Sequence, residues 1–320
     1  MKGTPLVSVV LPVFNGEKFV AEAIHSIQSQ TLTDWELVIV DDGSHDRSFE
    51  ICRDMANQDG RIRVFRNERN LGLARTMNRL VSLARGKYIA IQEQDDVSVP
   101  ERLAWEVEVL ESDKEIGLVS GIAAWLNDEG QVFAYFPGLL VQGKQYPQDK
   151  PKMVKFLYTE QCKVVNAACM FRRSIANEIS GPFDEKAKIS IDWQFFLHVA
   201  HRYRIWGISK VLVKMRRGEK HQSVTKNKDL QFHEARRCIR LIYDYYRTNP
   251  DSPINYWLYR KAMATEMILE GRYYSGIRGW LRLIQAIVYD PLSKHAWKSF
   301  LDLSLRGLNK GCRLLFPSRR

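Results

Sequence analysis

Three carboxylates lie within four residues of one another at the end of an apolar stretch. Glu93, Asp95 and Asp96 follow residues 88–91, Tyr-Ile-Ala-Ile, which have the composition of a buried strand. Carboxylate oxygens are the ligands that hard divalent cations prefer, and such a cation can neutralise the phosphates of a bound nucleotide. A solvated acidic loop is the alternative interpretation. The choice between the two depends on the elements around this segment.

The first hundred residues alternate between strand-like and helix-like patterns. Apolar, β-branched runs predict strands at 7–12, 35–40, 62–65 and 88–91, and helical periodicity predicts helices at 17–30, 47–57 and 73–84. Strands that alternate with helices at this spacing pair in parallel through right-handed crossovers. The sequence therefore predicts an α/β fold with a mostly parallel, Rossmann-like sheet.

Polar residues follow the carboxyl ends of the predicted strands. They lie at Pro12 to Glu17, Asp41 to Ser44, Asn70 to Gly72 and Glu93 to Asp96. Ligands of open α/β sheets bind beyond these ends, so four loops are expected to converge on one crevice. Neither Gly-x-Gly-x-x-Gly nor Gly-x-x-x-x-Gly-Lys-Ser/Thr occurs in the sequence. A metal held by carboxylates is therefore the expected means of neutralising phosphate.

Five segments in order carry a resemblance to a known family. They are Val-Ser-Val-Val-Leu-Pro-Val-Phe-Asn-Gly-Glu, Val-Ile-Val-Asp-Asp-Gly-Ser, Asn-Leu-Gly-Leu-Ala-Arg-Thr-Met-Asn, Ala-Arg-Gly-Lys-Tyr-Ile-Ala and Glu-Gln-Asp-Asp. Over about residues 5–225 the chain resembles family 2 glycosyltransferases of the GT-A (nucleotide-diphospho-sugar transferase) fold. The resemblance implies an inverting enzyme that uses a UDP-sugar and Mn²⁺ or Mg²⁺.

The resemblance also implies which residues bind the nucleotide-sugar. The first two loops would hold the base and the ribose through Pro12, Phe14, Asn15, Glu17, Asp41 and Asp42. Asn70, Arg75 and Asn78 would line the pyrophosphate side. Structural alternatives exist for three of these residues: a helix cap for Asn15, a turn cap for Asp42 and an ordinary exposed helical position for Arg75.

The resemblance places the metal at the acidic segment. Glu-Gln-Asp-Asp matches the family's Asp-x-Asp motif, so Asp96 would bind the cation and Asp95 would reach the ribose or the metal. Glu93 replaces the commoner aspartate, and its longer side chain puts direct ligation in doubt. His221, in the basic loop after residues 211–217, is a further candidate ligand. A solvated loop histidine is the alternative for His221.

Asp192 matches the position of the family's general base. It would deprotonate the acceptor hydroxyl as that oxygen attacks C1 of the sugar opposite the departing UDP. The alternative is a helix N-cap, and both roles are compatible. Because a helix N-terminus favours negative charge, the pKa of Asp192 is expected to be lowered.

The C-terminal part of the chain is strongly basic. Residues 201–320 contain 25 Lys/Arg and 9 Asp/Glu, within a chain whose formal net charge is +11. We predict a catalytic domain at 1–225 and a basic helical region at 226–320. A final helix from about residue 294 places Arg306, Lys310 and Arg313 opposite its apolar face. This region either packs on the catalytic domain or lies on an anionic membrane surface, and nucleic acid is not an expected partner.

The compartment is predicted from cysteine usage and hydropathy. The five cysteines include no Cys-x-x-Cys pair, which is typical of reduced, buried thiols in the cytoplasm. Nothing resembles a signal peptide, and no stretch approaches 18 uninterrupted apolar residues. We expect a cytoplasmic protein, peripheral on the inner face of the cell membrane if the basic region binds there.

Residues 134–151 are expected to form a mobile connection or an acceptor-side loop.

The expected reaction is single-sugar transfer to a hydroxyl of a glycan or lipid-linked acceptor in polysaccharide or cell-surface glycan biosynthesis. A Gln-x-x-Arg-Trp motif, the family's mark of processive polymerases, is absent. Two alternatives stay open. A nucleotidyltransferase would need a Gly-rich, basic loop after the first strand, where Val13 to Glu17 is acidic. A non-catalytic protein would bind nucleotide-sugars or polyanions without turnover.

Overall fold

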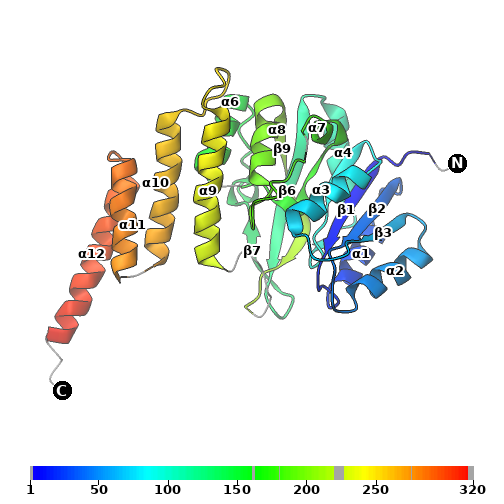
Figure 1. Cartoon of the computed structure of the whole chain (residues 1–320), viewed down its shortest axis with the longest axis horizontal. Helices are drawn as coiled ribbons and strands as arrows, with labels where there is room; N and C mark the ends of the chain where they lie inside the picture. The colour runs from blue at the N-terminus through cyan, green and yellow to red at the C-terminus, as the bar shows by residue number, and fades with distance from the viewer. Residues whose placement is uncertain (1–2, 161–162, 180, 220–226, 275, 316–320) are drawn as a thin grey trace. The chain divides into compact units, whose positions relative to one another are not determined.

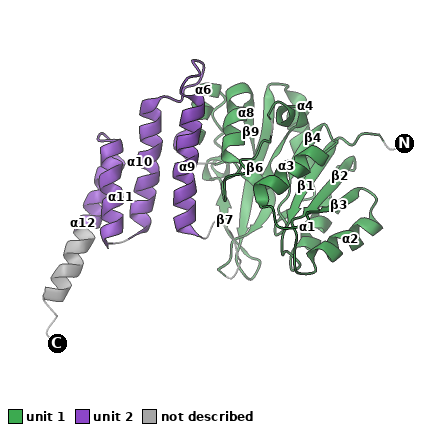
Figure 2. Ribbon diagram, viewed as in Figure 1, with its two compact units in different colours: residues 1–157, 162–226 green, residues 158–161, 227–320 purple. Residues whose placement is uncertain are grey.

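A mixed β-sheet forms the centre of the first of two units in this protein. The computed structural model describes residues 3–160, 163–179, 181–219, 227–274 and 276–315, with side chains up to residue 304. The first unit comprises residues 1–157 and 162–226, and the second comprises residues 158–161 and 227–320 (Figure 2).

Within the described residues the sheet has nine strands in the order β3-β2-β1-β4-β8-β6-β9-β5, and β7 pairs with β6. The strands are β1 (Val7–Val13), β2 (Trp35–Asp41), β3 (Ile62–Arg66), β4 (Tyr88–Ile91), β5 (Val97–Ser98), β6 (Ile116–Leu126), β7 (Val132–Phe136), β8 (Met170–Arg172) and β9 (Arg204–Arg216).

The first four strands form the parallel half of the sheet. Helices α1 (Val20–Gln28), α2 (Ser48–Gln58) and α3 (Leu73–Leu83) connect them. β1 pairs in parallel with both β2 and β4, and β2 pairs in parallel with β3, which confirms the predicted alternation. Every residue of β2 is buried, as expected for a parallel strand that is covered on both faces. All four strand ends therefore point their loops toward the same edge of the sheet.

The second half of the sheet is mixed. β8 runs antiparallel to β4, with Tyr88 opposite Arg172, Ile89 opposite Phe171 and Ala90 opposite Met170. β8 also runs antiparallel to β6, whereas β6 and β9 are parallel. The helical elements of this half are α4 (Arg102–Ser112), α5 (Gly138–Val141), α6 (Lys150–Thr159), η1 (Asn166–Ala168), α7 (Arg173–Asn177) and α8 (Trp193–Arg202).

The loop expected at 134–151 is only partly a loop. Ala134 to Phe136 belong to β7, and α5 and the start of α6 also fall within the segment. Residues 132–136, Val-Phe-Ala-Tyr-Phe, have strong β propensity and pair antiparallel with β6. Trp125 of β6 stacks on Phe136, with ring centroids 5.8 Å apart. Cross-strand aromatic packing of this kind stabilises a hairpin, which is why the segment forms a strand.

The second unit is helical, as predicted for the C-terminal region. It contains α9 (Lys228–Tyr246), α10 (Tyr256–Tyr273), α11 (Gly276–Tyr289) and α12 (Lys294–Leu315) (Figure 1). Asn227 and Asn255 cap α9 and α10 by accepting hydrogen bonds from Leu230 and Leu258. A Cβ on Gly271 would lie 2.7 Å from Leu283, so this glycine lets α10 and α11 approach closely. No helix in the described part of the chain combines the length and the hydropathy needed to cross a bilayer.

Candidate functional site

The three predicted carboxylates lie together at the carboxyl end of β4. Carboxylate oxygens of Glu93, Asp95 and Asp96 all lie within 4.8 Å of one another. Asp96 is almost fully buried, and Glu93 and Asp95 are half-buried. β4 lies between β1 and β8 in the sheet, so the cluster is at the centre of the edge where the parallel-strand loops meet.

The cluster holds more negative charge than the protein around it neutralises. Burial raises the pKa of Asp96 well above its usual range, and the charges of Glu93 and Asp95 raise it further. Burial and the charge of Asp95 raise the pKa of Glu93 to about 7. Asp96 Oδ2 is buried and has no hydrogen-bond partner in the described part of the protein. Oxygen donors of this kind fit a hard divalent cation such as Mn²⁺ or Mg²⁺.

A fully buried arginine lies beneath the loop that carries Glu93, Asp95 and Asp96, called here the acidic loop. Arg102, in the first turn of α4, donates from Nη2 to the carbonyl oxygen of Ile91 at 2.8 Å and from Nη1 to Ser98 Oγ at 2.9 Å. Its Nε pairs with the equally buried Glu106 at 3.3 Å. Sequence reasoning missed Arg102, because a cation near the start of an amphipathic helix is ordinarily exposed.

Gln92 connects this arginine to the loop itself. Its Nε2 donates to the carbonyl oxygen of Asp96 at 2.7 Å and to that of Glu93 at 3.0 Å. Its Oε1 accepts from Ser98 Oγ at 2.6 Å. The main chain is thus held on both sides of the carboxylates, so their positions are determined before any ligand binds.

Gln94 ties the acidic loop to the first loop. Gln94 Oε1 accepts from the main-chain N–H of Phe14 at 2.8 Å, and its Nε2 donates to the Phe14 carbonyl at 3.1 Å. A Cβ on Gly16 would lie 2.4 Å from Gln94 Oε1, so glycine leaves the space that this amide occupies. In the sequence Gln94 reads as a spacer between carboxylates, and nothing there indicates this role.

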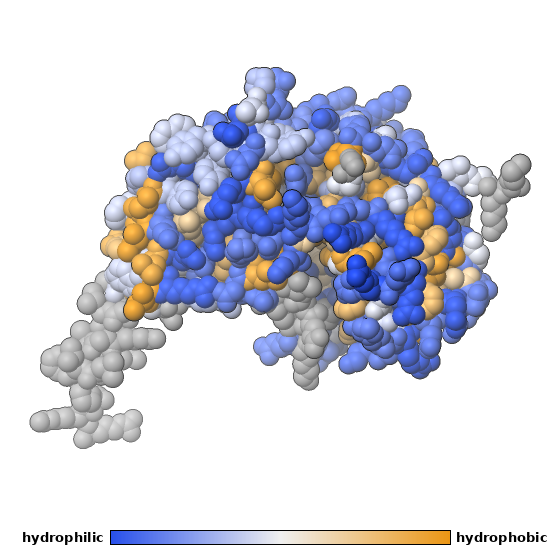
Figure 3. All heavy atoms as spheres, in the orientation of Figure 1, coloured by the Kyte–Doolittle hydropathy of each residue, from blue (hydrophilic) through white to orange (hydrophobic). Residues whose placement is uncertain are grey.

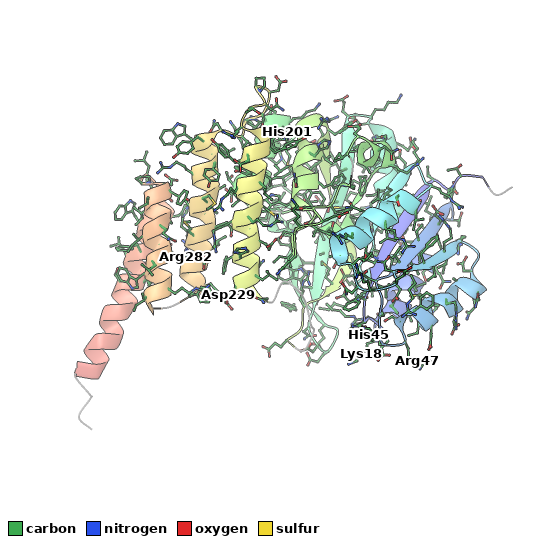
Figure 4. All side chains as sticks on the ribbon, viewed as in Figure 1. Lys18, His45, Arg47, His201, Asp229 and Arg282 are labelled. Carbon is green, nitrogen blue, oxygen red and sulfur yellow. The ribbon has the colours of Figure 1, made fainter. Side chains whose placement is uncertain are left out.

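The first and second loops are joined by side chain-to-main chain hydrogen bonds. Asn15, in the left-handed region at φ 48°, accepts from the N–H of His45 at 2.9 Å and donates its own N–H to Ser44 Oγ at 3.0 Å. Glu17 accepts from the N–H of Arg47 at 3.2 Å. α1 begins after Phe19 without a side-chain cap, so Asn15 caps the second loop rather than α1. Figure 4 shows Lys18, His45 and Arg47 at one edge of this unit.

The two aspartates after β2 have different surroundings. Asp41 is fully buried, and its Oδ2 accepts from the N–H of Ser44 and pairs with Arg66, both at 3.1 Å. Asp41 Oδ1 has no hydrogen-bond partner among the described residues. Asp42 accepts from the N–H groups of Leu71 and Gly72, both at 2.9 Å. Asp42 therefore holds the main chain of the third loop instead of capping its own turn. Asp41 accepts within that turn and retains its other oxygen for a ligand.

Pro12, near the end of β1, and Phe14, in the loop that follows, have different positions and exposure. Pro12 is on β1 opposite Val40, whereas Phe14 follows the strand and is 39% exposed. Phe14 directly follows Val13, the residue of β1 that pairs with Asp41 of β2. An exposed aromatic ring combined with a buried carboxylate has the composition of a site for a planar base.

α3 connects the third loop to the segment before Asp192. Asn70 accepts from the N–H of Gly72 at 3.0 Å. Arg75 pairs with Glu185 at 3.1 Å, and Asn78 accepts from the N–H of Phe183 at 3.0 Å. Arg75 therefore has an ion partner. Among the described residues, no contact links its side chain to the acidic cluster. Its ion pair holds the segment that leads to Asp192.

Asp192 immediately precedes α8 and makes no side-chain capping hydrogen bond. Burial raises its pKa to about 6, although main-chain N–H groups of Asp192 and Trp193 oppose the shift. The expected lowering by the helix N-terminus is therefore wrong, because desolvation outweighs it. The charge of Asp192 also contributes to the raised pKa of Glu93, as the smallest of its causes.

Arg217 is a cation near the cluster that sequence reasoning did not single out. Its charge lowers the pKa of both Glu93 and Asp96 against the effect of burial. Its main-chain N–H donates to the carbonyl oxygen of Leu126 at 2.9 Å, just beyond β9. The basic run at the end of this strand was the available signal. His221, the predicted ligand from the same loop, lies outside the described residues.

Comparisons with known proteins agree with this geometry. Residues 8–180 match the model of the family described as Glycosyl transferase family 2. An uncharacterized glycosyltransferase of Methanocaldococcus jannaschii is 32% identical over 215 residues, which cover 66% of this chain and 71% of that protein.

Solved structures resemble the whole chain in fold. S. aureus TarS 1-349 in complex with UDP-GlcNAc gives a TM-score of 0.64 at 18% identity, covering 93% of this chain and 88% of that one. A mannosyltransferase of Pyrobaculum calidifontis in complex with GDP-Man and Mn²⁺ gives 0.53 at 16% identity, covering 99% and 89%. The predicted GT-A fold with C-terminal helices is confirmed.

Proposed function

Because this chain belongs to glycosyl transferase family 2, we propose that it is an inverting, metal-dependent enzyme that transfers a sugar from a UDP-sugar to a hydroxyl group. The observation that carries the proposal is the cluster of Glu93, Asp95 and Asp96 at the carboxyl end of β4, whose carboxylate oxygens lie within 4.8 Å of one another. The proposal places the cation at this cluster and the base at Asp192, whose charge contributes to the raised pKa of Glu93.

The first two loops are proposed to bind the nucleoside. Phe14 offers an exposed ring for stacking, and Asp41 Oδ1 is a buried acceptor without a partner in the described residues, suited to an imide N–H of uracil. Pro12, Asn15, Glu17 and Asp42 would shape this pocket through the loop contacts described above. Asn70 and Arg75 would border the pyrophosphate, with Arg75 exchanging Glu185 for phosphate oxygens.

The acidic cluster is proposed to hold Mn²⁺ or Mg²⁺. Asp96 would be the principal ligand, and Glu93 and Asp95 contribute further oxygens from within the same 4.8 Å. The bound cation would act as a Lewis acid for the diphosphate, where negative charge develops as the nucleotide departs. His221 remains a proposed additional ligand.

Asp192 is proposed to be the general base. It would take the proton of the acceptor hydroxyl as that oxygen forms a bond to C1 and the C1–O bond to the nucleoside diphosphate breaks on the opposite face. With a pKa of about 6 the carboxylate is mostly ionised at neutral pH while keeping useful basicity. Attack opposite the leaving group inverts the anomeric configuration.

The acceptor is proposed to be a glycan or a lipid-linked glycan, extended by one sugar during polysaccharide or cell-surface glycan synthesis. The missing Gln-x-x-Arg-Trp motif supports single transfer. We also propose a reducing, cytoplasmic setting, which the buried free thiols of Cys52 and Cys169 support.

The proposal is tested by measuring UDP release across a panel of nucleotide-sugars, with and without candidate acceptors. One UDP-sugar should be turned over in the presence of Mn²⁺, and Asp192→Asn should abolish transfer while UDP binding persists. Full transfer by Asp192→Asn would overturn the assignment of the base. UDP binding without release on any donor would instead favour a non-catalytic nucleotide-sugar binder.

A further inference from the structure

One face of α11 is apolar and exposed. Ile277, Leu281, Ile284 and Val288 recur at steps of four, three and four residues, and each is between 45% and 80% exposed. This set, called here the α11 stripe, spans about 16 Å along the helix. The opposite face already packs in the unit, through Gly279, Leu283 and Ala286. When one face of such a helix packs inside the unit, the other apolar face stays exposed. An exposed apolar face of this kind is typical of an interaction surface.

The charged residues of α11 lie to one side of the stripe. Arg278 and Arg282 pair with Glu270 of α10 at 3.2 and 2.9 Å. Glu270 is fully buried and also pairs with Arg236. One buried carboxylate thus faces three guanidinium groups, and Asp229 pairs with Arg278 at the surface. Glu270 and Asp229 are thus paired within the unit, and the group of Arg236, Arg278, Arg282, Glu270 and Asp229 has a positive balance.

Aromatic and basic side chains border the stripe. Arg260 donates to the carbonyl oxygen of Tyr289, and its guanidinium lies 5.8 Å from the ring of the exposed Trp257. This places an indole at the Val288 end of the stripe. The following turn exposes Leu292 by 91%. Figure 3 shows the hydrophobic surface along α11 and the start of α12.

α12 supplies the basic border. Trp280 of α11 contacts Phe300 of α12 with ring centroids 4.6 Å apart, so the two helices lie side by side. Lys294, Lys298 and Trp297 are exposed on this part of α12, and Asp302 is the one acidic residue in its described portion. Exposed apolar residues, indoles and lysines on neighbouring helices have the composition of a lipid-binding surface.

We propose that the α11 stripe docks on an anionic lipid bilayer surface. The four apolar side chains enter the acyl boundary, Trp257 and Trp297 lie at the headgroup level, and Lys294 and Lys298 contact the anionic headgroups. The proposal concerns the second unit alone and does not depend on the reaction assigned to the first. It also differs from the sequence-based expectation, which rested on Arg306, Lys310 and Arg313, whose side chains lie outside those described.

A second copy of the chain is the competing occupant. A two-fold interface uses the same patch on both partners, so the lysine-bordered patch would meet a second patch of the same sign of charge. An anionic headgroup layer meets the same lysines with opposite charge, and it also accommodates exposed indoles. Charge complementarity therefore favours the lipid surface.

The test is vesicle flotation of the full chain with POPC vesicles and with POPC vesicles containing 30% POPG. The wild type should float with the anionic vesicles. The triple variant Ile277→Gln/Leu281→Gln/Ile284→Gln should lower the partition coefficient by more than about tenfold, because the buried apolar surface is lost. A control with exposed residues of α9, Leu241→Gln/Tyr245→Gln, should bind like the wild type.

Charge is tested separately. Lys294→Gln and Lys298→Gln should each weaken binding to the POPG vesicles by about fivefold at low salt and leave binding to pure POPC unchanged. Equal flotation of wild type and triple variant, with both folded by circular dichroism, would overturn the proposal. The proposal would also be overturned if the wild type does not float with the vesicles but forms a dimer, and the triple variant does not form that dimer. UDP release from the donor panel is measured in parallel, so loss of catalysis and loss of lipid binding are told apart.

Discussion

Arg102 donates from Nη2 to the carbonyl oxygen of Ile91, 2.8 Å away, at the residue where β4 ends and the acidic loop begins. The same guanidinium pairs with Glu106 one helical turn along α4, and neither side chain is exposed. The loop that carries Glu93, Asp95 and Asp96 therefore rests on a buried ion pair. Such a pair tolerates removal of both partners better than removal of one, because a single substitution leaves an unpaired buried charge.

Arg102→Met is expected to destabilise the fold by about 3–5 kcal/mol, since Glu106 would stay buried without its partner. Arg102→Met/Glu106→Leu should recover much of that loss. Urea unfolding measures both. Mn²⁺ affinity in the presence of UDP should remain weakened in the double variant, because the hydrogen bonds to Ile91 and Ser98 are gone. A double variant with wild-type Mn²⁺ affinity would contradict a positioning role.

Asp96→Asn should separate ligand binding from intrinsic stability. Without a metal the variant should be as stable as the wild type or more so at pH 8, because burial and the charges of Glu93 and Asp95 disfavour the ionised form of this carboxyl in the folded protein. A ligand at about 100 times its Kd stabilises a fold by about 2.7 kcal/mol, and the variant should lose this increment from Mn²⁺ and UDP. Thermal unfolding measures both effects, with the exposed Asp34→Asn as a control. A Mn²⁺-dependent shift with UDP that survives Asp96→Ala would contradict the metal assignment.

The raised pKa of Asp192 predicts that activity rises with pH, whereas the contribution of Asp192 to stability falls. Its pKa is raised from 3.8 to about 6, so the folded protein holds a proton that the unfolded chain releases between these values. This contribution to stability is fully present below pH 3.8 and is lost as the pH rises through 6. Transfer activity needs the ionised base, and kcat/KM should rise through the same range.

Asp192→Asn should remove its own part of the stability trend, whereas the parts that come from the raised pKa values of Glu93, Asp96 and Glu106 remain. The variant should also lose the acid limb of activity and lower kcat by about 10²- to 10⁴-fold. The pH-dependence is followed by thermal unfolding in EDTA and by initial rates of UDP release. Asn70→Ala, in the third loop, serves as a control that leaves the titration in place. An acid limb of activity that persists unchanged in Asp192→Asn would assign the titration to another group.

Gly16 and Gln94 are expected to be coupled. In Gly16→Ala the new methyl carbon would lie 2.4 Å from the position that Gln94 Oε1 has now, so the two atoms would clash. Because the glutamine side chain can move, stability should change little, whereas UDP affinity should fall as the first loop loses its tie to the acidic loop. Gly16→Ala/Gln94→Ala should match Gln94→Ala alone, since the clash is then absent. Calorimetric titration with UDP and Mn²⁺ measures the cycle, and strictly additive losses would contradict the coupling.

The parallel half of the fold was predictable because its pattern is local. Buried β-branched runs such as residues 35–40 read as strands without reference to the rest of the chain, and each ends at a polar loop. The carboxylates at 93–96 were predictable for the same reason.

The residues that hold these loops were not predictable. Arg102 reaches Cys169 at 3.3 Å across 67 positions of sequence, and Gln94 reaches Phe14 across 80. No local pattern marks such partners, because long-range packing alone brings them together. Asp192 was found by its position in a motif, but the sign of its pKa shift was wrong. Burial is a property of the assembled fold, and it outweighed the effect of the helix N-terminus.

β4 and β8 share only three residue pairs, Tyr88 with Arg172, Ile89 with Phe171 and Ala90 with Met170. The strands on one side of this narrow seam, β1 to β3, lead into loops that are proposed to bind the donor, and on the other side lie β6 and β9. The two halves also meet where β5 pairs with β9 and where Arg102 donates to the carbonyl oxygen of Cys169. Under the proposed roles, a change of acceptor would therefore have to preserve contacts that the acidic segment and α4 make with both halves of the sheet.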